Sequence, residues 1–115
     1  MQGRSDPASL RASVELLASE ASVQEQYLRR LGTWPSADEL ALELDDVLPA
    51  ALASGLPASV AESASALDAY LVELCGPARA ELWTQEALRT APEWERAREL
   101  ARAVLREMDA AGMAA

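Results

Sequence analysis

Residues 36–76 read SADELALELDDVLPAALASGLPASVAESASALDAYLVELCG, and apolar residues recur in this stretch at steps of three and four. That spacing places them on one side of an α-helix, because side chains three and four residues apart share a face. Two Ser-x-x-Glu sequences, at 36–39 and 59–62, have the form of capping boxes, which start helices. Gly55 and the pair Gly76-Pro77 are stop signals. The stretch therefore predicts two helices, the first of them kinked or restarted at Pro49.

The residues on either side follow the same pattern. Residues 7–32 carry a seam with one polar interruption, made of Leu10, Val14, Leu17, Ala21, Gln24, Leu28 and Leu31. A third box at 22–25 coincides with the interruption, so we expect a break near residues 19–22 and an end at Gly32. Thr84 caps a short turn. The box at 90–93 opens a last helix with the stripe Trp94, Ala97, Ala101, Val104 and Met108.

These segments predict an all-α fold, a compact bundle of about four main helices plus one or two short helical segments. We expect a flexible N-terminus over residues 1–6, a single helical-bundle domain over 7–109 and a frayed C-terminus over 110–115. Ala occurs 25 times and Leu 18 times, and both are strong helix formers. The longest apolar run, 47–53, is seven residues, too short to cross a membrane.

Composition excludes most catalytic chemistry. His, Lys, Phe, Ile and Asn are absent, a bias that indicates a GC-rich genome. Without His or Lys the chain has no imidazole base, no Schiff base and no phosphate-loop lysine. Cys75 is the single cysteine, so no internal disulfide or thiolate zinc cage can form, and a cytoplasmic location is expected. We predict a protein that is not an enzyme and that uses no cofactor and no metal.

Charge is the feature closest to a functional signal. Residues 36–76 hold eight carboxylates and no basic side chain, so this block accounts for almost all of the net charge of −9. Such a block can attract a basic partner over a distance, although acidic blocks of this kind are more often solvated surfaces without a function. The sequence suggests a small acidic cytoplasmic protein-binding module, an inhibitor of antitoxin or immunity type. The candidate partner surface is Asp38, Glu39, Glu43, Asp45, Asp46, Trp34 and Trp83.

Two alternatives belong to other classes. Glu39, Glu43 and Asp46 fall on one stripe of a helix and could hold Mg²⁺. The fragment 43–46 resembles the ExxD half-motif of the all-α nucleotide pyrophosphohydrolases of the MazG type, which implies a carboxylate-metal enzyme acting on nucleotides. That family also has an upstream ExxE helix, which Glu15, Glu20 and Glu25 do not form. The other alternative is a homodimeric structural module.

The remaining distinctive residues have simpler interpretations. Arg98, Arg102 and Arg106 form a row on the last helix, but a net charge of −9 disfavours nucleic acid as a partner. We expect an exposed face with Glu95–Arg98 and Glu99–Arg102 pairs, or a dock for the acidic middle helices. Trp34 and Trp83 are expected to plug the bundle ends, and Cys75 to be a small core residue.

Overall fold

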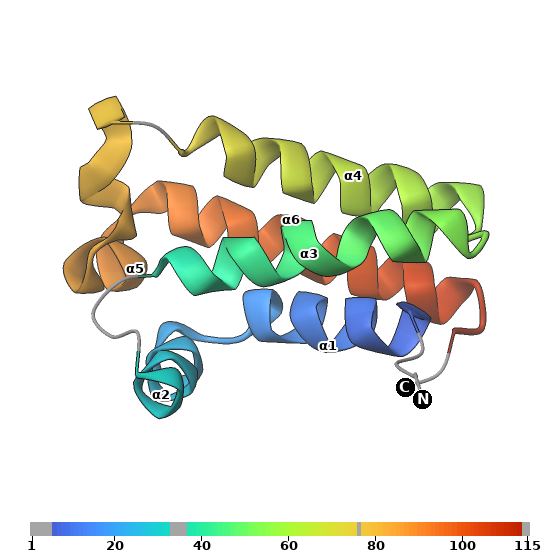
Figure 1. Cartoon of the computed structure of the whole chain (residues 1–115), viewed down its shortest axis with the longest axis horizontal. Coiled ribbons are helices and arrows are strands. Elements are labelled where there is room, and N and C mark those ends of the chain that lie inside the picture. The colour runs from blue at the N-terminus through green and yellow to red at the C-terminus, as the bar shows by residue number, and fades with distance from the viewer. Residues whose placement is uncertain (1–5, 33–36, 76, 114–115) are drawn as a thin grey trace.

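Four long helices form the body of the molecule. The computed structural model describes residues 6–32, 37–75 and 77–113. α1 (Asp6–Ala18) lies alongside α3 (Asp38–Ala53) and α6 (Pro92–Ala110), while α4 (Ala58–Glu73) lies alongside α6 and α3 (Figure 1). The shorter elements α2 (Ala21–Leu31), η1 (Pro77–Trp83, a 3-10 helix) and α5 (Gln85–Thr90) gather at one end. Every regular element in these ranges is helical, which confirms the predicted all-α bundle.

One core joins the four long helices. Its members are Leu10, Val14 and Leu17 of α1, Leu40, Leu44 and Leu48 of α3, Val60, Ala64, Leu67 and Leu71 of α4, and Trp94, Ala97, Ala101, Val104 and Met108 of α6. These are the positions that recur at steps of three and four. Removal of their apolar surface from water is the main force that sets the packing. The seam prediction fails at Leu31, which is exposed.

The predicted break between α1 and α2 is confirmed at residues 19–20, and side chains from α2 and α6 stabilise it. The amide of Gln24 donates to the carbonyls of Leu16 and Leu17, at 3.2 and 3.1 Å. Arg102 Nε donates to the carbonyl of Ala18 at 3.3 Å. A helix end leaves its last carbonyls without partners, and these donors satisfy them. Gln24 therefore interrupts the apolar seam because it caps a helix.

Three predicted capping boxes are wrong in the structure. α2 begins after Glu20, α4 after Pro57 and α6 after Ala91, each without a side-chain cap, so the boxes at 22–25, 59–62 and 90–93 do not form. Proline explains the last two cases. Pro57 precedes α4 directly and Pro92 occupies the first turn of α6, where its fixed φ favours the helix start. The Ser of the box at 36–39 lies outside the described residues.

Other local signals had mixed outcomes. The hydroxyl of Thr84 accepts from the Ala87 N–H at 3.2 Å, as expected of a cap. Gly32 ends α2 at φ +80°, a conformation that only glycine adopts without strain. The predicted restart at Pro49 is absent, because α3 continues to Ala53. Pro49 removes one backbone hydrogen bond, and the carbonyl that loses it belongs to exposed Asp45, where water can replace the donor.

Arg11 links the first and last helices. Its Nη2 donates to Asp109 at 3.0 Å and its Nη1 to the carbonyl of Met113 at 2.9 Å. The Met113 N–H also donates to the carbonyl of Met108 at 2.9 Å. The described part of the segment expected to fray, 110–113, is therefore hydrogen-bonded to α6 and α1.

Two indoles close the opposite end of the bundle. Trp94 is fully buried, and its Nε1 donates to the carbonyl of Leu82 at 2.6 Å. Trp83 packs edge-on against it with ring centroids 5.3 Å apart, and its Nε1 donates to the carbonyl of Leu74 at 2.8 Å. Trp83 therefore sits where a plug was expected. The prediction for Cys75 is wrong, because its position beyond the end of α4 leaves it exposed.

Candidate protein-binding surface

The outward side of α3 carries the predicted carboxylates. Leu40, Leu44 and Leu48 face the core, and Leu42, Asp45 and Asp46 lie on the exposed side of the same helix. We define the outer α3 surface as Glu39, Leu42, Glu43, Asp45, Asp46 and Pro49, which line a shallow depression of about 450 Å³. Four of its six residues are acidic. The structure thus brings together most of the carboxylates singled out in the sequence, with exposed Asp38 at the start of the same helix.

The carboxylates at the centre of this surface have no cationic partner. Glu43, Asp45 and Asp46 make no ion pair with any residue of the described ranges. Burial raises the pKa of Glu43. Burial also raises the pKa of Asp68 on α4, with a further contribution from the negative charge of Asp45. The charge of these carboxylates is therefore uncompensated by any residue in the described ranges, and Glu43 and Asp68 lie where their charged forms are disfavoured.

An apolar residue lies among these charges, and the sequence reasoning missed it. Leu42 is 55% exposed. Leu52, also exposed, shares its side of the helix, because residues 42, 45, 49 and 52 recur at steps of three and four. The pattern Leu40-Ala-Leu42-Glu-Leu44 contained the signal. One face of a helix cannot bury Leu42 together with Leu40 and Leu44, so Leu42 had to point outward.

The geometry required for the alternative metal site is not found. Glu39, Glu43 and Asp46 do lie along one side of α3, as their spacing predicted. Within residues 6–32, 37–75 and 77–113, however, no three His, Cys, Asp or Glu side chains converge closely enough to hold an ion. The three carboxylates lie on successive turns of α3, so they are spaced along the helix axis and do not surround one point where an ion could bind.

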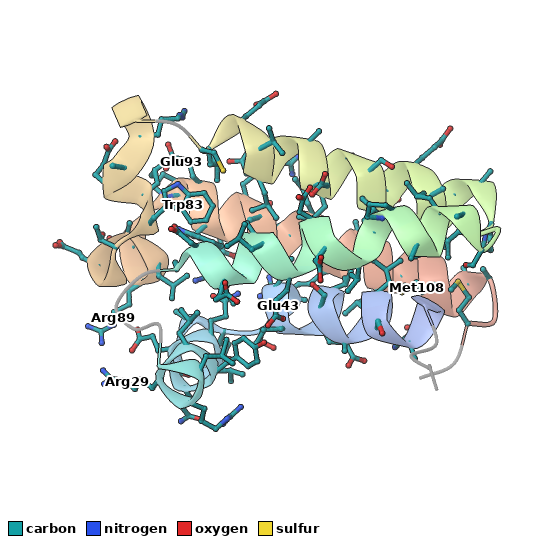
Figure 2. The ribbon with its side chains drawn as sticks, viewed as in Figure 1. Arg29, Glu43, Trp83, Arg89, Glu93 and Met108 are labelled. Atoms are coloured by element: carbon teal, nitrogen blue, oxygen red, sulfur yellow. The ribbon has the colours of Figure 1, made fainter. Side chains whose placement is uncertain are left out.

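Trp83 is not among the residues of the outer α3 surface. Trp34 lies outside the described residues. Trp83 stands on η1, at the end of the molecule opposite Met108 (Figure 2), and its ring packs edge-on against that of Trp94. Leu42 is therefore the apolar residue that the structure places beside the acidic side chains.

A second hollow adjoins the outer α3 surface on the side of α1. This α1–α3 groove has a volume of about 490 Å³ and is lined by Ser9, Ala12, Ser13, Leu16, Tyr27, Glu43, Asp46 and Val47. Glu43 and Asp46 also line the depression on α3, so the two hollows share one acidic edge. In Figure 2, Glu43 lies between α3 and α1. Ser13 is 6% exposed, and its Oγ has no hydrogen-bond partner in the described structure.

The arginine row on α6 is not the exposed face that was predicted. Arg98 is 5% exposed, and it donates to the side-chain oxygen of Gln24 and to the carbonyl of Leu88. Arg102 pairs with Glu95, while Glu99 pairs with Arg96. Arg98 and Arg102 turn towards α1, α2 and α5, where they donate to backbone carbonyls and to Gln24, while Arg106 is exposed. Within the described ranges none of the three pairs with an acid of α3 or α4, so the predicted dock for the acidic helices is not found either. Only the Glu95–Arg98 pair is confirmed.

A second ion pair fixes α2 against α5. Arg89 Nη2 donates to Glu25 at 3.0 Å, and Arg29 adds its positive charge from α2 itself. Figure 2 shows Arg29 and Arg89 at the same end of the molecule. The hydrogen bond from Arg89 is the main reason that the pKa of Glu25 is lowered. The charge of Arg89 is thus paired with Glu25 within the protein.

Comparison with known protein families, curated proteins and solved structures finds no match for this chain. No helix in the described ranges is long and apolar enough to cross a membrane.

Proposed function

We propose that this chain is a protein-binding module that recognises a basic protein through the outer α3 surface. The observation that supports it is the exposed side chain of Leu42 among the unpaired carboxylates of Glu43, Asp45 and Asp46. An apolar centre within a charged rim is typical of protein interfaces. The specific form proposed is an inhibitor of antitoxin or immunity type, in which the acidic surface covers a basic functional site of the partner.

Charge favours a basic partner over a second copy of the same chain. A symmetric dimer through the outer α3 surface would bring Asp45 and Asp46 of one copy against the same residues of the other. Like charges placed together cost several kcal/mol in an interface. A basic protein would instead supply the cations that the described structure does not provide to these carboxylates. Long-range attraction would also speed its association.

The test begins with capture of binding proteins from the native host, followed by stopped-flow kinetics with the protein recovered. Replacement of Glu43 by Gln and of Asp45 and Asp46 by Asn should slow association by roughly one order of magnitude at low salt. Affinity of the unmodified protein should fall between about 0.05 and 0.5 M salt, because screening shortens the reach of the charges. Leu42→Ala should mainly speed dissociation, since close contacts act on the complex already formed.

A matched control removes the same charge elsewhere. Glu20, Glu81 and Glu86 are exposed and lie outside the outer α3 surface, so their replacement by Gln should leave the association rate close to that of the unmodified protein. Equal slowing by both triple variants would show a general effect of net charge. Salt-independent affinity combined with unchanged association in the α3 variant would refute the proposal.

A further inference from the structure

The α1–α3 groove has hydrogen-bond acceptors that nothing in the described structure uses. Carboxylates of Glu43 and Asp46 stand on one wall, and neither forms an ion pair or hydrogen bond with another described residue. Ionised carboxylates only accept hydrogen bonds, so the group that completes this wall must be a donor. A positive charge on that group would also offset the mutual repulsion of the two acids.

Ser13 is the independent observation. It lies on the α1 side of the groove, more than nine-tenths buried, and its Oγ has no partner in the described ranges. Serines inside a helix can donate back to a carbonyl four residues earlier, as Ser19 does to Glu15 at 2.8 Å. Ser13 does not. A buried hydroxyl without a partner is unfavourable. The Oγ itself has almost no exposed surface, so a donor in the groove would satisfy it after the Ser13 side chain turns towards the groove.

We propose that the α1–α3 groove binds a guanidinium group, supplied by an arginine side chain of the basic partner. This inference rests on the proposed function and names the partner group that the shared acidic edge receives. A guanidinium presents five N–H donors in a plane, so one group can address two carboxylates and a hydroxyl at once. An ammonium is a compact charge and lacks that geometry.

The other walls of the groove suit the rest of an arginine. Ala12, Leu16 and Val47 offer apolar surface to the methylene groups, and the ring of Tyr27 can contact the cation. The volume of about 490 Å³ lies within the range of about 300–1,000 Å³ that is usual for small-ligand sites. Burial already raises the pKa of Glu43, so a cation beside it should lower that pKa again.

The first experiment uses three small probes, the amides of N-acetyl-arginine, N-acetyl-lysine and N-acetyl-citrulline. Amide chemical shifts of the full chain are followed in NMR titrations. The arginine probe should shift residues 9–16, 27 and 43–47. The lysine probe should bind more weakly, and citrulline, which has the shape but no charge, should cause no saturable change. Equal responses to all three probes, or shifts spread over the whole surface, would overturn the inference.

Variants then test the contacts. The double variant Glu43→Gln, Asp46→Asn should weaken the arginine probe on the order of tenfold, the value of one charge-assisted hydrogen bond. Ser13→Ala should also weaken it, without lowering the melting temperature, because the lost hydroxyl has no partner in the free protein. The matched control, Glu81→Gln with Glu86→Gln, removes the same charge at exposed positions outside both hollows and should leave the affinity unchanged. An unchanged affinity in the groove variants would refute the site.

The last step separates this inference from the proposed function. Binding of the captured basic protein is measured with the Glu43→Gln, Asp46→Asn variant and with Ser13→Ala. The guanidinium contact would be supported if both variants lose affinity for the captured protein, and if the unmodified chain also loses affinity when one arginine of the partner is changed to lysine. Partner binding that needs Leu42 and Asp45 but not Ser13 would leave the proposed function standing and overturn the groove. A groove that binds the arginine probe while no basic protein binds would be a small-molecule site, which also overturns the partner assignment.

Discussion

Arg98 donates two hydrogen bonds to the side-chain oxygen of Gln24, from Nη2 at 3.0 Å and from Nε at 3.3 Å. The amide nitrogen of the same Gln24 donates to the end of α1. The pair therefore connects α6 to the α1–α2 break through one buried amide, and burial lowers the pKa of Arg98. Replacement of one partner should strand the polar groups of the other.

We expect Gln24→Leu to reduce the free energy of unfolding by about 2–4 kcal/mol, because it leaves buried donors and acceptors unpaired. The double variant Gln24→Leu, Arg98→Leu should lose less free energy of unfolding than the sum of the losses in the two single variants, because the second change removes the cation that the first one leaves unpaired. Urea denaturation of the four proteins gives this double-mutant cycle. Exposed Arg106→Leu is the control and should change stability by less than about 0.5 kcal/mol. Strict additivity would contradict the coupling.

Stability should be highest at mildly acidic pH. The pKa of Glu43 and that of Asp68 are raised in the folded protein, so the folded state binds these protons more readily than the unfolded chain does. Stability should therefore rise as pH falls from neutral towards the raised pKa values. The pKa of Glu25 is lowered by Arg89, so its contribution is lost only at lower pH, as the carboxylate protonates in the folded state.

Urea denaturation across this pH range at constant ionic strength provides the measurement. Glu43→Gln should reduce the gain in stability as pH falls from neutral. Glu25→Gln should reduce the loss of stability at the acid end of the range. A loss of stability that begins directly below neutral pH would contradict the assignment of Glu43 and Asp68.

The hydrogen bond of Trp94 can be separated from its packing. Trp94→Phe should cost about 1–3 kcal/mol, because the buried Leu82 carbonyl loses its donor and the core loses ring volume. Trp83→Phe should cost less, since Trp83 is only partly buried. Thermal and urea unfolding of both variants test the order. An equal loss of stability in the two variants would show that burial of the indole does not determine the cost of its replacement.

Gly32→Ala should destabilise the chain by about 1 kcal/mol, because the positive φ at the end of α2 strains any residue that has a Cβ. Apart from the chain neighbours, no atom of the described residues lies within 4 Å of the added Cβ, so the expected cost is conformational and not steric. Gly32→Asn should cost less, since Asn tolerates this backbone region better than Ala. Urea denaturation compares the two variants, and equal losses would point to a cause other than φ.

The fold could be predicted because one force dominates it. Leu10, Val14 and Leu17 were placed correctly on the apolar seam, since apolar side chains at helical spacing are most stable when they share one buried face. Helix starts were predicted less well. Ser59 and Thr90 fit the capping motif, but Pro57 and Pro92 fix the backbone at the starts of these helices. The motif alone does not show whether the capping side chain or the proline decides where the helix begins.

For the candidate binding surface, the sequence predicted the acidic side chains but not the groove beside them. The carboxylates of α3 follow from sequence spacing alone. The α1–α3 groove does not, because it depends on how α1 and α2 pack against α3. Arg98 was misassigned for the same reason. Its partner Gln24 lies 74 positions away, and local spacing indicated only its neighbour Glu95.

The contact between Arg11 and Met113 joins residues 102 positions apart, and α6 supplies packing surface to both α1 and α4. During synthesis on the ribosome, α1 emerges long before α6 exists. Its residues Leu10, Val14 and Leu17 can be covered first by α3, which is made earlier, and only in part until α6 has left the exit tunnel. Contacts between such distant segments also close slowly, because the intervening chain must first be confined. The side of the core formed by α6 is therefore the last part of this bundle to be closed.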